Sequence, residues 1–272
     1  HKSPGYDEFS IDVIKQVANE LLTPLAYIFN LSCDQCVFPR DLKIAKVIPS
    51  YKAEDPTIVS NYRPISLISV FSKILEKVIH IKLYSYLEQK GLLYPRQFGF
   101  RKNHNTEYGI LDLLSNIRNA MEQRLYTIGV FLDLAKAFDT VDHSILLKKM
   151  SLYGVSEKSA TWFENYLSGR TQYVDINGTS TTLLPISCGV PQGSILGPLL
   201  FLIYINDLSN CVPGLQVILF ADDTNIFLSH KNISTLFSTM NAQLKNLENW
   251  FHANRLSINL TKTKYMVFGK ER

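Results

Sequence analysis

Three aspartates stand directly beside segments that have the length and composition of buried strands. Asp133 follows the apolar residues 126–132, and the pair Asp222-Asp223 separates two further apolar runs. Neighbouring carboxylates repel each other, and burial removes the water that stabilises their charge, at a cost of several kcal/mol for each unpaired ion. Either a Lys or Arg side chain or a bound divalent cation must therefore compensate these acids.

Hard, oxygen-liganded cations such as Mg²⁺ suit a site built from three carboxylates. Two such ions held about 3.5–4 Å apart can activate an attacking hydroxyl and stabilise a leaving pyrophosphate. The alternative is that Asp222-Asp223 is an exposed turn, since Asp is common in turns, but its apolar flanks favour a functional role. Asp139 and Asp142 are expected to cap or enter the following helix. Asp133, Asp222 and Asp223 are therefore the candidate catalytic and metal-binding residues.

The elements that must position these acids follow from the spacing of apolar residues. The spacing predicts helices over residues 11–30, 71–89, 107–124 and 233–254. Strands are predicted over residues 43–51, 126–132, 217–220, 226–228 and 265–268. The strands before and after Asp222-Asp223 form a hairpin with the acids at its tip. Asp142 is expected to cap a helix, and residues 199–205, apolar on every side, are expected to be buried.

The composition of the 272-residue chain excludes several classes of protein. It is 46% hydrophobic and 19% charged, which is typical of a globular core and not of a disordered chain. No apolar run approaches the roughly 20 residues of a membrane span, and the first residues lack the apolar core of a secretion signal. We expect an intracellular fragment, in nucleus and cytoplasm, that is neither secreted nor membrane-bound.

The four cysteines are too few and too scattered for a disulfide framework. Cys33 and Cys36 have the spacing of a zinc knuckle, but no second Cys-x-x-Cys supplies the other two ligands of a structural zinc. We expect buried thiols instead.

The charge is distributed unevenly. The chain has a net charge of +4, but residues 40–102 contain 12 Lys and Arg against 5 Asp and Glu, so that they carry +7 and the rest carries −3. This asymmetry fits a phosphate-binding part that precedes a metal-binding one. Solvated helix faces rich in Lys and Arg are an equally simple explanation.

Six segments occur in an order that is similar to a known family. They are residues 61–67 (NYRPISL), 97–101 (QFGFR), 131–143 (FLDLAKAFDTVDH), 189–198 (GVPQGSILGP), 220–223 (FADD) and 259–264 (NLTKTK). The third and fifth resemble the two acidic motifs of reverse transcriptases encoded by LINE-type (non-LTR) retrotransposons. Residues 189–198 resemble the loop between these motifs. Residues 61–67 and 97–101 resemble the family's fingers motifs, and residues 259–264 resemble its late palm motif.

The resemblance implies an α/β (α+β) right-hand polymerase, with fingers inserted around a palm whose antiparallel sheet packs on helices. It implies one reverse transcriptase domain, with an N-terminal extension and fingers (1–124), the first catalytic palm strand (125–145), connecting helices (146–190) and the remaining palm (191–268). So few residues follow Phe268 that the thumb is expected to be absent. The parent polyprotein is expected to supply the thumb and an endonuclease domain.

The family's roles carry over to matching positions of this chain. Asp133 and Asp222 would ligate both metals, with Asp223 beside them. Lys52 and Arg63 would grip the triphosphate, which agrees with the preference of phosphate oxygens for a Lys point charge and an Arg fork. Lys43 and Lys46 are close enough in sequence that either could exchange roles with Lys52.

Other positions would contact the nucleotide. Phe138 falls at the steric-gate position, where a ring would exclude a ribose 2′-OH, although an ordinary core phenylalanine is the alternative. Gln192 and Gly193 would face the incoming base pair, and Ser194 is expected to cap the next helix. Lys262 would stand near the pyrophosphate as a proton donor, unless it is a surface lysine.

The expected function is RNA-directed DNA synthesis by two-metal nucleotidyl transfer. It would use two Mg²⁺ ions, with Mn²⁺ as a substitute, and dNTPs, an RNA template and a DNA primer. An RNA-templated RNA polymerase is disfavoured by Ala221, where such enzymes usually have Gly, and by Phe138. Two further hypotheses are an inactive nucleic-acid-binding fragment and a purely structural domain.

Overall fold

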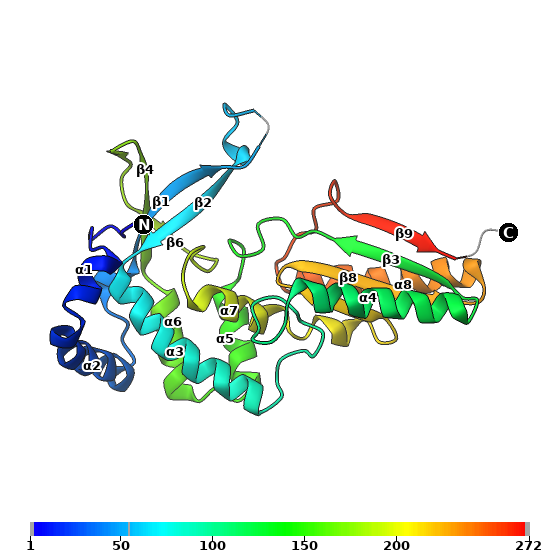
Figure 1. The fold of residues 1–272 in the computed structure, drawn as a ribbon, viewed down its shortest axis with the longest axis horizontal. Helices are drawn as coiled ribbons and strands as arrows, with labels where there is room; N and C mark the ends of the chain where they lie inside the picture. The colour runs from blue at the N-terminus through cyan, green and yellow to red at the C-terminus, as the bar shows by residue number, and fades with distance from the viewer. Residues whose placement is uncertain (1–2, 54, 270–272) are drawn as a thin grey trace. The chain divides into compact units, whose positions relative to one another are not determined.

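The computed structural model describes residues 3–53 and 55–269, and the chain forms two compact units (Figure 1). Unit 1 takes its residues from 1–86 and 142–200, and unit 2 takes its residues from 87–141 and 201–272. The chain therefore passes from one unit to the other three times.

Unit 1 contains a sheet in which the strand order is β2-β1-β4-β5, and β6 also pairs with β4. β2 runs antiparallel to β1, whereas β4 runs parallel to it. The strands are β1 (Ile44–Tyr51), β2 (Tyr62–Ile68), β4 (Arg170–Ile176), β5 (Thr179–Ser180) and β6 (Leu184–Ile186). The predicted strand over 43–51 is confirmed as β1. The other four were missed because they lack a clear apolar alternation and are held by pairing with β1 or with each other.

The rest of unit 1 is mainly helical. It contains the helices α1 (Ile11–Gln16), α2 (Ala18–Gln35), α3 (Val70–Gln89), α5 (His143–Leu152) and α6 (Glu157–Leu167), with short 3₁₀ turns η1 (Arg40–Lys43) and η2 (Val59–Asn61). The prediction of one continuous helix over 11–30 is wrong. Two helices, α1 and α2, meet at Val17, where φ is −109° and ψ is 23°. Apolar spacing cannot register a break of one residue. The cap predicted at Asp142 is confirmed, since its Oδ1 accepts the N–H of Ile145 at 3.0 Å.

Unit 2 is built on a four-stranded antiparallel sheet with the order β7-β8-β3-β9. Its strands are β3 (Tyr126–Leu132), β7 (Gln216–Phe220), β8 (Asp223–His230) and β9 (Lys264–Phe268). α4 (Thr106–Glu122) and α8 (Ile233–Ala253) cover opposite faces of this sheet (Figure 1). All of these elements were predicted to within a few residues. The antiparallel sheet packed on helices, expected for this fold class, is therefore confirmed.

The core of unit 2 is formed by alternate residues of the strands. Val130, Ile226 and Val217 lie in register across three strands and are 6%, 0% and 1% exposed. On the other face, Gly129 leaves room for the ring of Phe227, which would lie 2.5 Å from a Cβ at that position. The central strands of this sheet therefore bury side chains on both faces, although a hollow of about 770 Å³ remains between β3 and α8.

Helix α7 (Leu196–Ile205) contains the run that was expected to be buried, and residues 199–205 are at most 1% exposed. η3 (Leu208–Cys211) follows it. At the start of α7, Ser194 Oγ accepts the N–H of Gly197 at 2.9 Å, which confirms the predicted cap. Glu76 on α3 is 0% exposed and accepts the N–H of Ile195 at 2.7 Å. A buried carboxylate thus anchors the start of α7 next to the Gly/Pro loop.

The boundaries of the two compact units, after residues 86, 141 and 200, differ from the domain boundaries that the resemblance implied. Residues 87–124, which were expected to belong with the N-terminal part, lie in unit 2, where α4 contacts β3 and β7. Among the helices of residues 3–53 and 55–269, none combines the length and the apolar character that a membrane crossing requires.

Candidate active site

Strands β3 and β8 bring two of the predicted acids side by side in unit 2. Their antiparallel register ends with Leu132 opposite Thr224, and the same alternation continued by one residue would set Asp133 opposite Asp223. Opposing residues of an antiparallel pair have Cα atoms about 4.5–5.5 Å apart and side chains on the same face. Two carboxylates therefore share one face at the end of the sheet.

The third acid, Asp222, lies in the turn between β7 and β8. Phe220 pairs with Asp223, so Ala221 and Asp222 are the two turn residues. Ala221 has a φ of +57°, as the first turn position of a type II′ hairpin requires. For an alanine this conformation costs about 1–2 kcal/mol. The predicted hairpin with acids at its tip is confirmed, and its turn is strained.

The acids interact unfavourably with one another. Burial raises the pKa of Asp222, and the charges of Asp223 and Asp133 raise it further. Burial and the charge of Asp133 likewise raise the pKa of Asp223. Desolvation and like charges both disfavour the ionised form of a carboxyl group. The site therefore holds negative charge that its own neighbours oppose.

Lys262 approaches these acids from the segment that precedes β9. The C=O of Asp133 accepts the N–H of Asn259 at 2.8 Å, and the C=O of Asn259 accepts the N–H of Lys262 at 3.2 Å. Lys262 Nζ lies 3.7 Å from Asp133 Oδ2, and its side chain is 66% exposed. Such an exposed pair contributes little, and the pKa of Asp223 is raised although Lys262 acts to lower it. A basic side chain therefore stands beside the acids and compensates them only in part.

The three carboxylates have the right chemistry to bind a divalent cation, but their side chains are not grouped for it in this structure. Three carboxylates at neighbouring positions offer the oxygen ligands that Mg²⁺ and Ca²⁺ prefer. In the part of the chain that the structure describes, however, no three His, Cys, Asp or Glu side chains are grouped so that they could hold a metal ion. Repulsion between the carboxylates, which raises the pKa values of Asp222 and Asp223, opposes a closer grouping.

A second group of predicted residues lies in unit 1, on the β1–β2 hairpin. Ser50 pairs with Arg63, and the C=O of Asn61 accepts the N–H of Lys52 at 2.9 Å. Arg63 and Lys52 belong to the same face of the hairpin, because Lys52 lies two residues beyond Ser50. Lys52 and Arg63 are both exposed.

The two residues that could have exchanged roles with Lys52 are engaged elsewhere in unit 1. Lys43 is 9% exposed and donates to Asn165 Oδ1 at 3.0 Å, and Lys46 lies 3.6 Å from Asp175. Lys52 is therefore better placed than either to meet a phosphate.

The Gly/Pro loop is attached to the same strand as Arg63. The C=O of Gln192 accepts the N–H of Ser66 at 2.9 Å. Gly193 has a φ of +113°, and a Cβ there would lie 2.5 Å from the Ser66 carbonyl oxygen. Glycine is therefore required for the close approach of the loop to β2.

Phe138 lies in unit 2, in the loop after β3. Its half-buried ring stacks on Phe201, with centroids 4.6 Å apart, and meets the edge of Phe100 at 6.2 Å. These contacts hold the ring in place, and they fit both a gate that must be rigid and an ordinary packing residue.

The sequence analysis did not single out Gln97 as a residue of the acidic hairpin's surroundings. It lies in the QFGFR segment that was assigned to the fingers, yet the structure places it in unit 2, 2% exposed and in contact with Ala221. A polar residue inside an otherwise apolar, aromatic segment was the available signal, but its partner is 124 residues away in the sequence.

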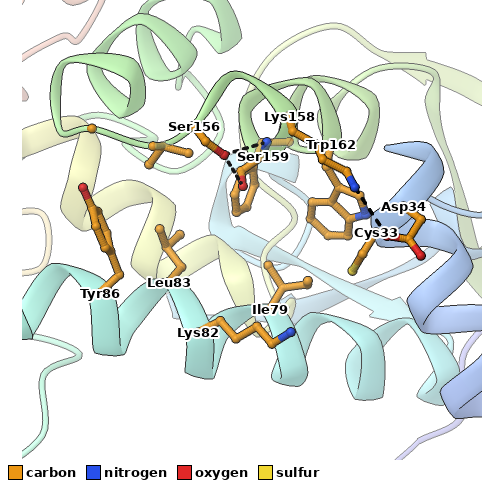
Figure 2. A pocket seen from close by; sticks show the side chains of 13 residues that line it. Cys33, Asp34, Ile79, Lys82, Leu83, Tyr86, Ser156, Lys158, Ser159 and Trp162 are labelled. Carbon is orange, nitrogen blue, oxygen red and sulfur yellow. Dashed lines mark hydrogen bonds and ion pairs between the residues drawn. The ribbon is translucent and has the colours of Figure 1, made fainter.

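A cavity of about 450 Å³ lies elsewhere, in unit 1, between α3 and α6 (Figure 2). Its apolar walls include Ile79, Leu83 and Trp162, and an exposed ion pair of Lys158 with Asp34, 3.4 Å long, lies at its margin. None of the predicted catalytic or nucleotide-binding residues lines it. The acidic hairpin therefore remains the candidate active site.

The cysteines do not form a site either. None of the four forms a disulfide; Cys33, Cys36 and Cys211 are half-buried, and Cys188 is exposed. The expectation of buried thiols is therefore wrong. Cys33 and Cys36 lie where α2 ends, a position that the sequence pattern gave no reason to bury.

Comparison with known proteins identifies a matching family. The chain matches the family described as "Reverse transcriptase (RNA-dependent DNA polymerase)" over residues 51–271. It is 32% identical over 276 residues to an RNA-directed DNA polymerase from the mobile element jockey of Drosophila melanogaster, covering 98% of this chain and 30% of the relative.

Two further relatives come from other mobile elements. A probable RNA-directed DNA polymerase from transposon BS of Drosophila melanogaster is 33% identical over 214 residues, covering 76% of this chain and 23% of the relative. A Pol polyprotein from the type-1 retrotransposable element R2 of Popillia japonica is 30% identical over 217 residues, covering 75% and 29%. The chain spans less than a third of the length of these relatives.

Replacing Asp222 with Asn tests the electrostatics of the site. Because the folded-state pKa of Asp222 is raised, its ionised form opposes folding, and this cost is fully present at neutral pH and lost below about pH 4. In EDTA at pH 7 the variant should therefore melt at a higher temperature than the unmodified protein. With Mg²⁺ at ten times its Kd, only the unmodified protein should gain about 3–6 °C. Equal Mg²⁺ effects on both proteins would contradict the metal site.

Proposed function

Because the chain belongs to the reverse transcriptase (RNA-dependent DNA polymerase) family, we propose that it copies the RNA of a LINE-type element into DNA. It would add deoxynucleotides to a DNA 3′ end annealed to an RNA template. The observation that carries the proposal is the arrangement of Asp133, Asp222 and Asp223 at the end of one sheet, where like charges stand together without a buried basic partner in the described residues.

The acids would hold the cations on which this chemistry depends. Two bound Mg²⁺ ions, or Mn²⁺ in their place, would supply activation of the primer hydroxyl and stabilisation of the leaving pyrophosphate. Asp133 and Asp222 would bind both ions, and Asp223 would complete the negative field. Lys262, already held near Asp133 by the backbone pairing of Asn259, would donate a proton to the pyrophosphate.

The remaining residues would bind and select the nucleotide. Lys52 and Arg63, on one face of the β1–β2 hairpin, would bind the triphosphate through a point charge and a planar fork. Gln192 and Gly193 would face the new base pair, and Phe138 would exclude a ribose 2′-OH. In this assignment the sheet of unit 2 is the palm, and the hairpin of unit 1 belongs to the fingers.

Primer extension tests the proposal directly. The full chain, incubated with poly(rA)/oligo(dT), dTTP and Mg²⁺, should extend the primer, and EDTA should stop it. Asp222→Ala should lower the rate by at least about a thousandfold, because a metal ligand is lost. Efficient extension with UTP in place of dTTP would indicate an RNA polymerase instead. RNA binding without extension by either protein would indicate a non-catalytic binding module.

Replacing Phe138 with Ala tests the gate. Without the ring, the space for a 2′-OH opens, and discrimination between dTTP and UTP should fall by about tenfold or more in kcat/KM. Phe131→Ala is a matched control, because it also removes a half-buried ring. Phe131 packs on Phe227 within the sheet of unit 2, with ring centroids 5.7 Å apart. If both variants keep the original discrimination, Phe138 is a packing residue only.

A further inference from the structure

The side chain of Gln97 binds the strained residue of the acidic turn. Its Oε1 accepts the N–H of Ala221 at 3.0 Å, and its Nε2 donates to the C=O of Ala221 at 3.4 Å. Oε1 also accepts the N–H of Gly99 at 2.8 Å. One buried amide group thus engages both backbone polar groups of the residue that has a φ of +57°.

The backbone around Gln97 is fixed to the same hairpin. The N–H of Phe98 donates to the C=O of Leu219 at 2.8 Å, and the N–H of Leu219 donates to the C=O of Arg96 at 2.9 Å. A Cβ on Gly99 would lie 2.3 Å from the Ala221 nitrogen. Residues 96–99 therefore lie along β7, with Gln97 in a parallel bridge to Leu219. The backbone of Gly99 is so close to Ala221 that a side chain at position 99 would clash with it.

These contacts oppose a relaxation that the turn would otherwise undergo. Negative φ is the common state of an alanine, and a buried N–H without a partner is costly. Ala221 immediately precedes Asp222, so a change in its φ would redirect Asp222 and displace the end of β8, where Asp223 begins the strand. The support for Ala221 thus also determines where two of the three carboxylates point.

We propose that Gln97 is a positioning residue, which holds Ala221 in its left-handed conformation and so keeps Asp222 and Asp223 directed to the same site as Asp133. The role of these acids in binding cations rests on the proposed function, whereas the support of the turn does not. Gln97 itself touches neither substrate nor metal; it acts through the backbone of Ala221.

Three substitutions in the full chain separate this role from general stability. Gln97→Met keeps the length of the side chain and removes its hydrogen bonds. Ala221→Gly removes the strain, because glycine adopts positive φ without a steric cost. Thr127→Val is the matched control: Thr127 is 2% exposed and its Oγ1 lies 2.8 Å from Ser229 Oγ, at the end of the β3–β8 ladder away from the acids.

Amide hydrogen exchange and the Mg²⁺ dependence of the melting temperature are the measurements. Gln97→Met should speed exchange in the turn between β7 and β8 and raise the midpoint Mg²⁺ concentration by about five- to thirtyfold, as expected for the loss of one or two buried hydrogen bonds. The double variant, Gln97→Met with Ala221→Gly, should have a Mg²⁺ midpoint within about threefold of that of the single variant Ala221→Gly. Thr127→Val should lower the melting temperature and leave the midpoint unchanged.

The outcomes distinguish this inference from the proposed function. Suppose that the unmodified protein extends primers, and that Gln97→Met has the same amide exchange rates in the turn and the same midpoint Mg²⁺ concentration. The inference is then overturned and the function stands. If extension is absent but exchange and midpoint change as expected, the function fails and the inference stands. Should Gln97→Met not fold alone, the double variant decides: a midpoint well above that of Ala221→Gly would overturn the role through Ala221.

Discussion

The pairing of β3 with β8 determines most of what this chain can do. Its register, continued by one residue, would set Asp133 beside Asp223 at the end of the sheet, and the two-residue turn adds Asp222 next to them. The sheet is stabilised by its apolar faces, with Val130 and Ile226 in register and nearly inaccessible. Shifting the register by one residue would send each acid to the other face. The same packing that stabilises unit 2 therefore forces the carboxylates together against their repulsion.

Two unfavourable features are thus built into one turn. The carboxyl groups have raised pKa values through burial and mutual charge, and Ala221 adopts a conformation that alanine avoids. Strain of this kind persists only where the surroundings over-determine it, and it is concentrated at functional sites. Here the surroundings are the side chain of Gln97 and the backbone of Gly99, which contact Ala221 directly. A cation bound by the acids would offset the repulsion that remains.

The sequence was sufficient for the parts of the site that depend on local pattern. The acids could be found because apolar runs framed them, and the cap at Asp142 and the buried run 199–205 of α7 followed from residue type and spacing. Apart from β1, the strands of unit 1 could not be found in this way: the middle of β2 around Pro64 is exposed and carries little apolar alternation. The contacts of Gln97 with Ala221 and of Glu76 with Ile195 join residues more than 100 positions apart. Only the folded chain shows which buried polar groups become partners.

The most direct test of this account is the titration of the aspartate side chains, followed by NMR on selectively ¹³C-labelled carboxyl carbons. Without Mg²⁺, Asp222 and Asp223 should titrate above the ordinary aspartate pKa of about 3.9, because burial and neighbouring charge disfavour ionisation. With saturating Mg²⁺ both should remain ionised to a distinctly lower pH, since proton and cation compete for the same oxygens. Titration curves that coincide with and without Mg²⁺ would contradict the claim that the acids are held together to bind cations.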